Sequence, residues 1–416
     1  MRFRDLPLHA RHTYYYDLRS AMLVGIFGGM LLPFVSVVGR KIGATHFQIA
    51  LLAAAPYLAN AFTLLWTEDL FGQGRVWYVV WPCVLGRGLL VTMFWVYSPA
   101  WYTAVIFLYM FITAVPFPSY AYIMKTNYPE ALRGRLMSRV RVRTALFWIA
   151  SSALAGYVLE KGTGNYRYIF PAAAVFGVLS ALQFRRVKVR REERKRGSLR
   201  GIGSFRAPFS DPVFLRFLAA YTVFESGMLL ALPVFPLVLV DESHISNFAT
   251  GIYGSVFSGM WLAGFFFWGH FMDRFTVRKT LALIFMAAST VPLLYLMTRD
   301  ILVLGAAQGA AGFVFAAVEL ANYIVVIRMA EPKEVPHYMA ASIALGGVRG
   351  AIAPFIGTAL YGRYGAGAAF TISLFLMLFS VFLAFMLFKR PVLPRGPERG
   401  VSKTGHPAGS LAEKDK

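Results

Sequence analysis

Four ionisable side chains lie well inside long apolar stretches of the sequence, where they could perform chemistry. They are Glu225, Glu319, Arg87 and Arg349. A charge within hydrocarbon costs ~2.5–3.5 kcal/mol on insertion scales, so such residues mark functional or tightly paired sites. Burial disfavours the ionised form of a carboxylate, whereas a neighbouring arginine favours it. We therefore predict that Glu319 or Glu225 is a proton site and that Arg349 modulates it.

A simpler interpretation stands beside this hypothesis. Arg349 and one of the two glutamates could form a fixed structural ion pair between helices. For Arg87 we favour a structural role. The sequence alone leaves both interpretations of the Arg349 pair open.

A polar stripe crosses the apolar stretch 301–327. Positions 308, 312, 315, 319 and 322 lie four, three, four and three residues apart, so they share one helix face. In the same way Tyr221 shares a face with Glu225, and aromatic residues recur along 101–124. With Arg349, the predicted substrate-cavity residues are Gln308, Asn322, Tyr323, Tyr221, Tyr109 and Tyr120.

The elements that carry these residues are apolar helices. Hydrophobic residues make up 57% of the 416 residues and charged residues only 15%, against ~25% charged in soluble domains. About 20 apolar residues cross ~30 Å of hydrocarbon. We predict an all-α integral membrane protein with twelve transmembrane helices at 20–38, 47–66, 77–96, 101–124, 144–160, 167–184, 217–239, 248–268, 280–298, 301–327, 338–361 and 366–388.

The positive charge is concentrated on one side of these helices. The net charge is +22, and most of the 42 Lys and Arg fall in the termini and in alternate loops. Basic loops stay in the cytoplasm, so both termini are predicted to be cytoplasmic. The net positive charge therefore indicates which side of the membrane each loop occupies, and we expect no nucleic-acid binding.

The longest basic loop divides the chain in two. We predict an N-terminal six-helix bundle over 1–184, a basic cytoplasmic linker over 185–216, a C-terminal six-helix bundle over 217–389 and a disordered cytoplasmic tail over 390–416. The linker should contact anionic lipids. At a constant offset of 201 residues the halves match at Phe47 and Phe248, Tyr122 and Tyr323, and Gly156 and Gly357. This pattern favours two pseudo-symmetric repeats around a central pathway.

The segment after the stretch 248–268 reads GHFMDRFTVRK, from Gly269 to Lys279. It resembles the loop motif of the major facilitator superfamily, Gly-x-x-x-Asp-Arg-x-Gly-x-Arg-Arg/Lys, at five of six defining positions. Thr276 replaces the usual second glycine, and the equivalent loop at 68–75 is degenerate. The resemblance implies alternating access around a cavity lined by the stretches 217–239 and 301–327. It also implies a gating motif, in which Gly269 would allow close approach of backbones, formed by Gly269, Asp273, Arg274, Arg278 and Lys279.

We thus predict a secondary transporter of a small organic solute in the plasma (inner) membrane of a prokaryote. Proton coupling is expected, and export of amphipathic or aromatic compounds is favoured over uptake. One alternative is transport of an organic anion or sugar acid by means of Arg349. Another is a non-transporting relative that acts as a sensor or assembly partner. We expect no enzyme activity, cofactor or metal site, because no phosphate loop, metal-ligand cluster or catalytic pair occurs in the sequence. We also expect a monomer.

Overall fold

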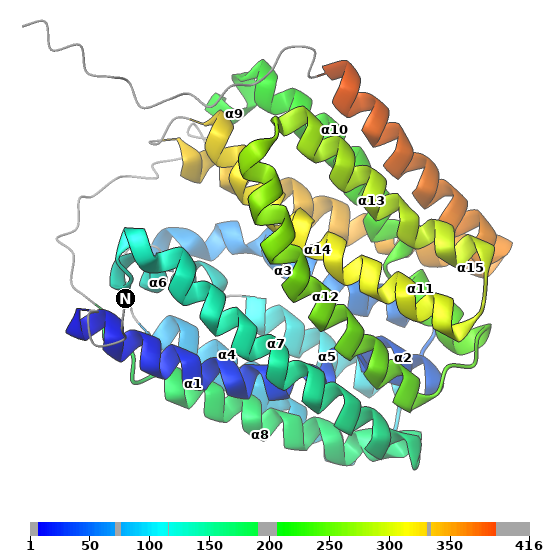
Figure 1. Cartoon of the computed structure of the whole chain (residues 1–416). Helices are drawn as coiled ribbons and strands as arrows, with labels where there is room; N and C mark the ends of the chain where they lie inside the picture. Colours follow the sequence, from blue (N-terminus) through cyan, green and yellow to red (C-terminus); the bar gives the residue numbers. More distant parts are fainter. Residues whose placement is uncertain (1–6, 71–75, 115, 190–205, 331–333, 388–416) are drawn as a thin grey trace, which may run out of the picture.

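The computed structural model describes residues 7–70, 76–114, 116–189, 206–330 and 334–387, and within these ranges it contains helices and no strand (Figure 1). The first half of the chain forms α1 (Leu8–Leu31), α2 (Val35–Lys41), α3 (His46–Leu70), α4 (Trp77–Leu89), the 3-10 helix η2 (Leu90–Trp95), α5 (Pro99–Ala114), α6 (Phe117–Asn127), α7 (Glu130–Glu160), the 3-10 helix η3 (Thr163–Asn165) and α8 (Tyr166–Phe184).

The second half begins with a short helix before the first long one. It forms α9 (Arg206–Ser210), α10 (Pro212–Ala231), α11 (Val234–Asp241), α12 (Asn247–Arg274), α13 (Val277–Met297), α14 (Ile301–Met329) and α15 (Val335–Leu387). Residues 190–205 of the predicted linker and the predicted tail lie outside the described ranges. The boundaries of the four predicted segments therefore stay predictions.

The order of helices agrees with twelve spans. Eight of the described segments are long and apolar enough to cross a membrane by length and composition. The helix α15 has 53 residues, which as one straight helix would be ~80 Å long and far exceed ~30 Å of hydrocarbon. It is interrupted at Gly365, where φ is 81° and ψ is 178°. The two arms of α15 thus occupy two predicted spans, while α3, α12 and the pair α5 and α6 occupy three others.

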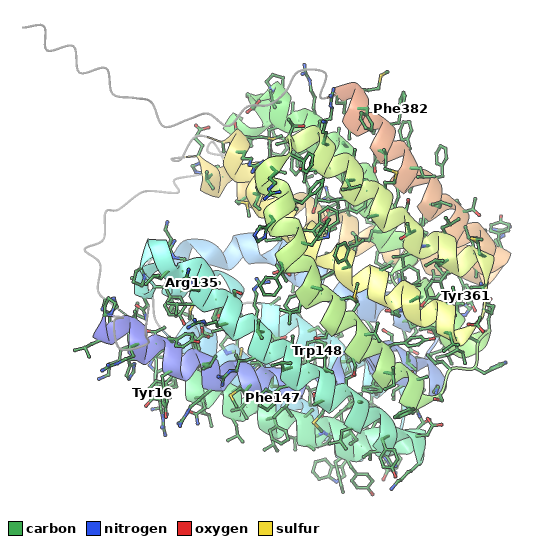
Figure 2. The ribbon with its side chains drawn as sticks, viewed as in Figure 1. Tyr16, Arg135, Phe147, Trp148, Tyr361 and Phe382 are labelled. Atoms are coloured by element: carbon green, nitrogen blue, oxygen red, sulfur yellow. The ribbon has the colours of Figure 1, made fainter. Side chains whose placement is uncertain are left out.

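The outer surface is apolar, as lipid contact requires. Trp101, Phe375 and Phe382 have exposed fractions of 69%, 64% and 53%. Figure 2 shows Phe382 pointing away from the bundle on the second arm of α15. Large apolar side chains exposed on helices long enough to span a membrane are expected where lipid covers the protein. The all-α membrane fold predicted from the composition is confirmed.

Each half packs its own helices around an apolar core. In the first half α1 packs against α7 and α8, and α4 packs against α5 and α8. In the second half α10 and α13 pack against α15, and α12 packs against α14. The halves meet where α7 contacts α12 and where α3 contacts α15. These are therefore two six-helix bundles joined along two pairs of helices.

Small residues bring α7 and α12 together. A Cβ built on Gly251 would lie 2.5 Å from the backbone oxygen of Ser152 and 3.0 Å from the Cα of Gly156. The hydroxyl of Ser152 donates to the Gly251 oxygen at 2.8 Å, and Ser255 donates to the Ile149 oxygen at 2.9 Å. Close backbone approach with hydroxyl bonds across helices is the usual packing of membrane helices. The interface between the halves is thus narrow and hydrogen-bonded.

The two halves repeat each other in local detail. The turns after the first and seventh spans each contain one residue of positive φ, Gly43 at 99° and His244 at 47°. Just beyond, Thr45 and Ser246 each accept a hydrogen bond from the N–H three residues later, at 3.2 and 3.0 Å. The helices α3 and α12 begin at the next residue. Each matched position differs by the offset of 201 residues that the sequence indicated.

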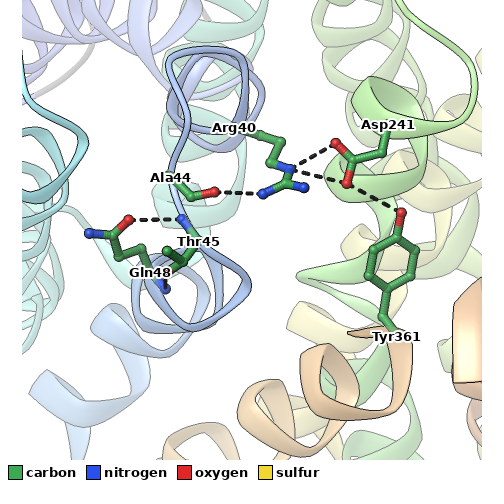
Figure 3. Close-up of polar contacts among 6 residues, drawn as sticks. All are labelled: Arg40, Ala44, Thr45, Gln48, Asp241 and Tyr361. Carbon is green, nitrogen blue, oxygen red and sulfur yellow. Dashed lines mark hydrogen bonds and ion pairs between the residues drawn. The ribbon is translucent and has the colours of Figure 1, made fainter. Parts of the chain in front are cut away.

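One end of the bundle holds α2 and α11, opposite the start of α1, and we call it the distal end (Figure 1). There Arg40 Nε donates to both oxygens of Asp241, at 2.7 and 3.0 Å, and Arg40 Nη1 donates to the Ala44 oxygen at 2.8 Å (Figure 3). Tyr361 on α15 donates to Asp241 at 3.3 Å. The His46 ring packs edge-on against Tyr361 with centroids 5.3 Å apart. Arg40 and Asp241 thus join the two halves at this end.

Two further contacts close the distal end. Lys41 Nζ donates to the Ile245 oxygen at 2.6 Å and to Asn247 Oδ1 at 2.9 Å. On α7, Glu160 accepts a hydrogen bond from the Phe248 N–H at 2.9 Å, at the start of α12. Each bond links one half to the other. Together with the Arg40–Asp241 pair they form what we call the distal latch.

The close contact of α7 with α12 predicts a specific cost for added volume. Gly251→Ala should lower the apparent melting temperature in detergent, because its Cβ meets backbone, and overpacking of this kind costs ~1–3 kcal/mol. On the same helix, Gly269→Ala meets no described atom within 4 Å. This control should keep or raise the melting temperature, since alanine is the better helix former. Equal melting temperatures for the two variants would contradict the close approach.

Candidate functional site

The buried ion pair of the C-terminal half lies near the middle of its helices. Arg349 Nη2 donates to Glu225 Oε2, and Arg349 Nη1 donates to Thr222 Oγ1 at 2.7 Å. The Arg349 and Glu225 side chains are only 7% and 14% exposed. At 1.5 Å per residue both lie ~20 Å from the starts of α15 and α10. The pair therefore lies well inside two segments that are long and apolar enough to span a membrane.

Glycine and tyrosine fix the surroundings of this pair. A Cβ on Gly346 would lie 3.7 Å from Arg349 Nη2 and 3.9 Å from Glu225 Oε2, so glycine leaves space beside both groups. One residue after Arg349, the ring of Tyr57 occupies the position that a Cβ on Gly350 would take. Tyr57 belongs to α3 of the other half. The pair thus lies next to the α3–α15 contact between the halves.

These contacts select between the two glutamates considered for Arg349. Arg349 binds Glu225 and does not bind Glu319. The sequence left open a proton site and a fixed structural pair, and the geometry is compatible with both. Transport driven by a pH gradient distinguishes the proton site from the structural pair.

Glu319 pairs instead with an arginine that the sequence analysis left in a loop. Arg141 Nη2 donates to Glu319 Oε1 at 2.9 Å, and the two side chains are 35% and 28% exposed. The expected span began at residue 144, but α7 begins at Glu130 and places Arg141 within the helix. The sequence allows the span at 144–160 to continue as an amphipathic helix through Arg139 and Arg143, and the structure extends it further still. The pair joins α7 of one half to α14 of the other.

Aromatic rings from α12 flank the Arg141 guanidinium. Its Cζ lies 4.2 Å from the ring centroid of Phe265 and 5.6 Å from that of Trp261. The two rings meet edge-on, with centroids 4.8 Å apart. Rings at these distances attract a cation through their quadrupole. Arg141, Glu319, Trp261 and Phe265 thus form one cluster, which we call the Arg141 cluster.

The polar stripe of α14 contacts several different helices. Gln308 donates to the Tyr295 hydroxyl at 2.9 Å, and Asn322 accepts from Ser342 at 2.8 Å. Tyr221 on α10 is buried and donates to the Val318 oxygen at 3.5 Å. The side chain of Tyr323 lies outside the described residues. Among the described residues the stripe is therefore a set of interhelical bonds, and that of Glu319 reaches the other half.

The two tyrosines of the fourth span face the core of the first half. Tyr109 is 5% exposed and packs edge-on against Phe27 with centroids 5.7 Å apart. Tyr120 donates to Asp17 Oδ1 at 3.2 Å, while Tyr128 donates to Asp17 Oδ2 at 2.8 Å. Both tyrosines thus contact α1 within the first half, and their role as cavity residues stays a prediction.

Asp17 is a buried acid that the sequence analysis missed. It is 3% exposed, on α1, and accepts hydrogen bonds from the two tyrosines above. It escaped notice because the first apolar stretch was taken to begin at residue 20, whereas α1 begins at Leu8. The residues from 8 to 19 are more polar than the stretch that follows, so hydrophobicity alone did not show that they belong to the same helix.

Arg87 has the structural surroundings that we favoured for it. Its Nη1 donates to the Gly177 oxygen at 2.9 Å and to Ser180 Oγ, both on α8. Its Cζ lies 5.2 Å from the ring centroid of Phe27. These contacts tie α4 to α8 and α1 within one half. None of them reaches the interface between the halves.

The loop motif lies at the end of α12 and the start of α13. A Cβ on Gly269 meets no described atom within 4 Å, so the close backbone approach expected there is not observed. Arg274 and Lys279 are exposed, and Arg278 lies 6.0 Å from the Phe385 ring. The side chain of Asp273 lies outside the described residues. The gating role of Gly269, Asp273, Arg274, Arg278 and Lys279 therefore stays a prediction.

An arginine from another helix binds the end of α12. Arg328 on α14 donates to the Met272 oxygen at 2.8 Å and to the Phe275 oxygen at 3.5 Å. The last carbonyls of a helix lack partners within the helix, and cations near them are favourable. Arg328 lies outside the motif, and nothing in its spacing indicated this contact.

Comparison with known proteins gives a family and a set of similar folds. The sequence profile of the Major Facilitator Superfamily matches residues 20–237 and 217–413. The structure is similar to that of the nucleoside transporter NupG, with a TM-score of 0.66, 13% identity, and coverage of 91% of this chain and 98% of that chain. Comparison with curated protein sequences gives no significant match.

Two further folds are similar over most of their length. A bacterial homologue of the human lysosomal transporter Spinster, inward-facing and unoccupied, has a TM-score of 0.64 and 14% identity, with 92% of this chain and 96% of that chain covered. The human organic anion transporter MFSD10 has a TM-score of 0.59 and 15% identity, with 91% and 100% covered. Since the profile matches both halves and the helices follow the same fold, the chain belongs to the Major Facilitator Superfamily of multi-pass membrane transporters.

Proposed function

We propose that the protein is a proton-coupled secondary transporter of a small organic solute and that Glu225 carries the proton. The observation that supports this most is the Glu225–Arg349 pair, 14% and 7% exposed, well inside α10 and near the middle of the first arm of α15. A charge pair that deep is stable only while both partners are ionised. A proton on Glu225 removes one charge and leaves the other buried, so protonation has a large effect on local packing.

Such a change can reach the contact between the halves. The first arm of α15 carries Arg349 and also packs its Gly350 against Tyr57 and its Gly347 against Ala61 of α3. A ligand or proton shifts a conformational equilibrium only by its differential affinity for the two states. Here the two protonation states of Glu225 differ in their attraction to Arg349, because only the ionised carboxylate forms the ion pair. Glu225 is therefore placed to bias the relative position of the halves.

The conformation described here supports alternating access with the distal end closed. The distal latch holds the halves together at that end, and in Figure 1 α7 and α12 diverge toward the opposite end. The basic loops assign that opposite end to the cytoplasm. On this proposal the structure is the inward-facing state. Transfer to the other state requires the latch to open.

The names of the similar structures give different solutes, a nucleoside in one case and an organic anion in another. The solute class of this protein must therefore be argued from its own residues. Arg349 is 7% exposed and already paired, which weakens its proposed use for an organic anion or sugar acid. Export, the plasma membrane of a prokaryote, lipid contact by the linker and a monomeric state remain part of the proposal. A non-transporting sensor is the alternative that a transport assay decides.

The proton role of Glu225 predicts a selective defect. Glu225→Gln in proteoliposomes should abolish accumulation driven by a pH gradient in either direction but retain exchange of solute down its own gradient. The solute is first identified by a thermal-shift panel, since a bound ligand raises apparent stability by mass action. Glu242→Gln is the control, because Glu242 pairs with Arg299 at the distal end. Unchanged pH-driven accumulation in Glu225→Gln would assign the pair a structural role.

The distal latch predicts a change in accessibility. Arg40→Gln/Asp241→Asn should raise the alkylation rate of a cysteine at Ala44, which is 0% exposed, in a Cys83→Ser background. A loss of ~1 kcal/mol of closure corresponds to about a fivefold rise. Arg299→Gln/Glu242→Gln also removes a distal pair but one within a single half, so it should leave the rate unchanged. A rise in both variants, or in neither, would exclude the latch role.

A further inference from the structure

The Arg141 cluster offers more hydrogen-bond donors than the protein provides acceptors. The Arg141 guanidinium binds Glu319 through Nη2 alone, at 2.9 Å. Its Nη1 is buried without a partner among the described residues, and so is the indole Nε1 of Trp261. A buried donor without an acceptor is costly, so such atoms mark places for a ligand or ordered water.

The cluster also provides an apolar surface beside these donors. The Phe265 ring centroid lies 4.2 Å from the Arg141 Cζ, and the Trp261 ring meets the Phe265 ring edge-on. On α14, Phe315 is 43% exposed and contacts Phe257 of α12, with ring centroids 6.0 Å apart. Ligand sites combine apolar and aromatic walls with a few polar groups. A ligand here meets aromatic rings and an arginine together.

The Glu319 carboxylate holds the place that an external anion would take. Arg141 and Glu319 are 35% and 28% exposed, so solvent reaches the pair, unlike the pair of Glu225 and Arg349. A planar guanidinium binds any carboxylate with the same geometry. An incoming carboxylate therefore competes with Glu319 for Arg141.

From these contacts we propose that Arg141 and Trp261 bind the carboxylate of an aromatic organic anion whose apolar part packs against Phe265, and that Glu319 is displaced from Arg141 when this anion binds. The proposal rests on the proposed transport function, whose solute class it names. Displacement also removes the bond between α7 and α14, which connects the two halves. Binding of the solute thus releases a contact that the empty protein keeps.

The test is direct binding to the purified full chain in detergent, without transport. The probes are 3-phenylpropionate and indole-3-propionate, each beside its amide and the corresponding amine. Each carboxylate should bind at least about tenfold more tightly than its amide, which is the ratio given by one charge-assisted bond. Equal binding of the amide, tighter binding of the amine, or no binding of either carboxylate would overturn the proposal.

Glu319→Gln gives the sharpest discrimination. If Glu319 competes with the ligand, its neutral replacement should tighten carboxylate binding about tenfold and leave amide binding unchanged. If Glu319 only supports the fold, binding should weaken or stay constant, and the proposal fails. Glu242→Gln removes an equally exposed paired glutamate at the distal end and should change nothing.

The arginine has its own matched control. Arg141→Gln should remove the preference for carboxylate over amide, whereas Arg143→Gln, an exposed arginine two residues later, should keep it. The double variant Arg141→Gln/Glu319→Gln leaves no unpaired charge and keeps the test valid if the single variant misfolds. Binding in detergent is independent of the pH-driven assay on Glu225→Gln, so failure of one proposal is distinguishable from failure of the other.

Discussion

Lipid offers a charged side chain no partner, and this constraint organises the interior of the protein. Every charge deep in a bundle must find its counter-charge or hydrogen bonds within the protein. Arg87 binds backbone and a hydroxyl of α8, Asp17 binds two tyrosines, and Glu225 binds Arg349. The partners named here for each of these groups belong to its own half. The Arg141–Glu319 pair differs, because it is partly exposed and joins the two halves.

The separation of charges within halves allows the halves to move. The α7–α12 interface consists of glycines, serines and backbone oxygens, such as the contact of Gly251 with Ser152. Contacts of this kind are short and weak individually, so the interface can break without exposing a charge to lipid. The bonds that carry charge across the interface lie at the distal latch and in the Arg141 cluster. On the proposed mechanism, these few bonds are the charged contacts between the halves that must break when the protein changes state.

Much of the fold is predictable from the sequence for a simple physical reason. A span needs length and apolar composition, and the repeat offset of 201 residues marks equivalent turns even where residue types differ, as at Gly43 and His244. The site is less predictable, because hydrophobicity identifies the apolar part of a helix but does not show how far the helix extends beyond that part. The helices α1 and α7 extend beyond their apolar stretches, so Asp17 and Arg141 were placed outside the membrane.

Partners were harder to predict than positions. The spacing of the α14 stripe correctly places its residues along one helix, but it carries no information on which helix lies opposite each turn. Gln308 meets α13, Glu319 meets α7 and Asn322 meets α15. Helix packing determines these partners, and it depends on where small residues allow helices to approach closely.

The Arg40–Asp241 bond has a consequence for the symmetry of the molecule. The two residues are 201 positions apart, so they are each other's counterparts in the two repeats. On a two-fold axis a position meets its own copy. Two identical halves would place two arginines or two aspartates together there, and like charges at such a distance repel. A duplicated six-helix unit could therefore gain this attraction only after its copies had diverged in sign at this one position.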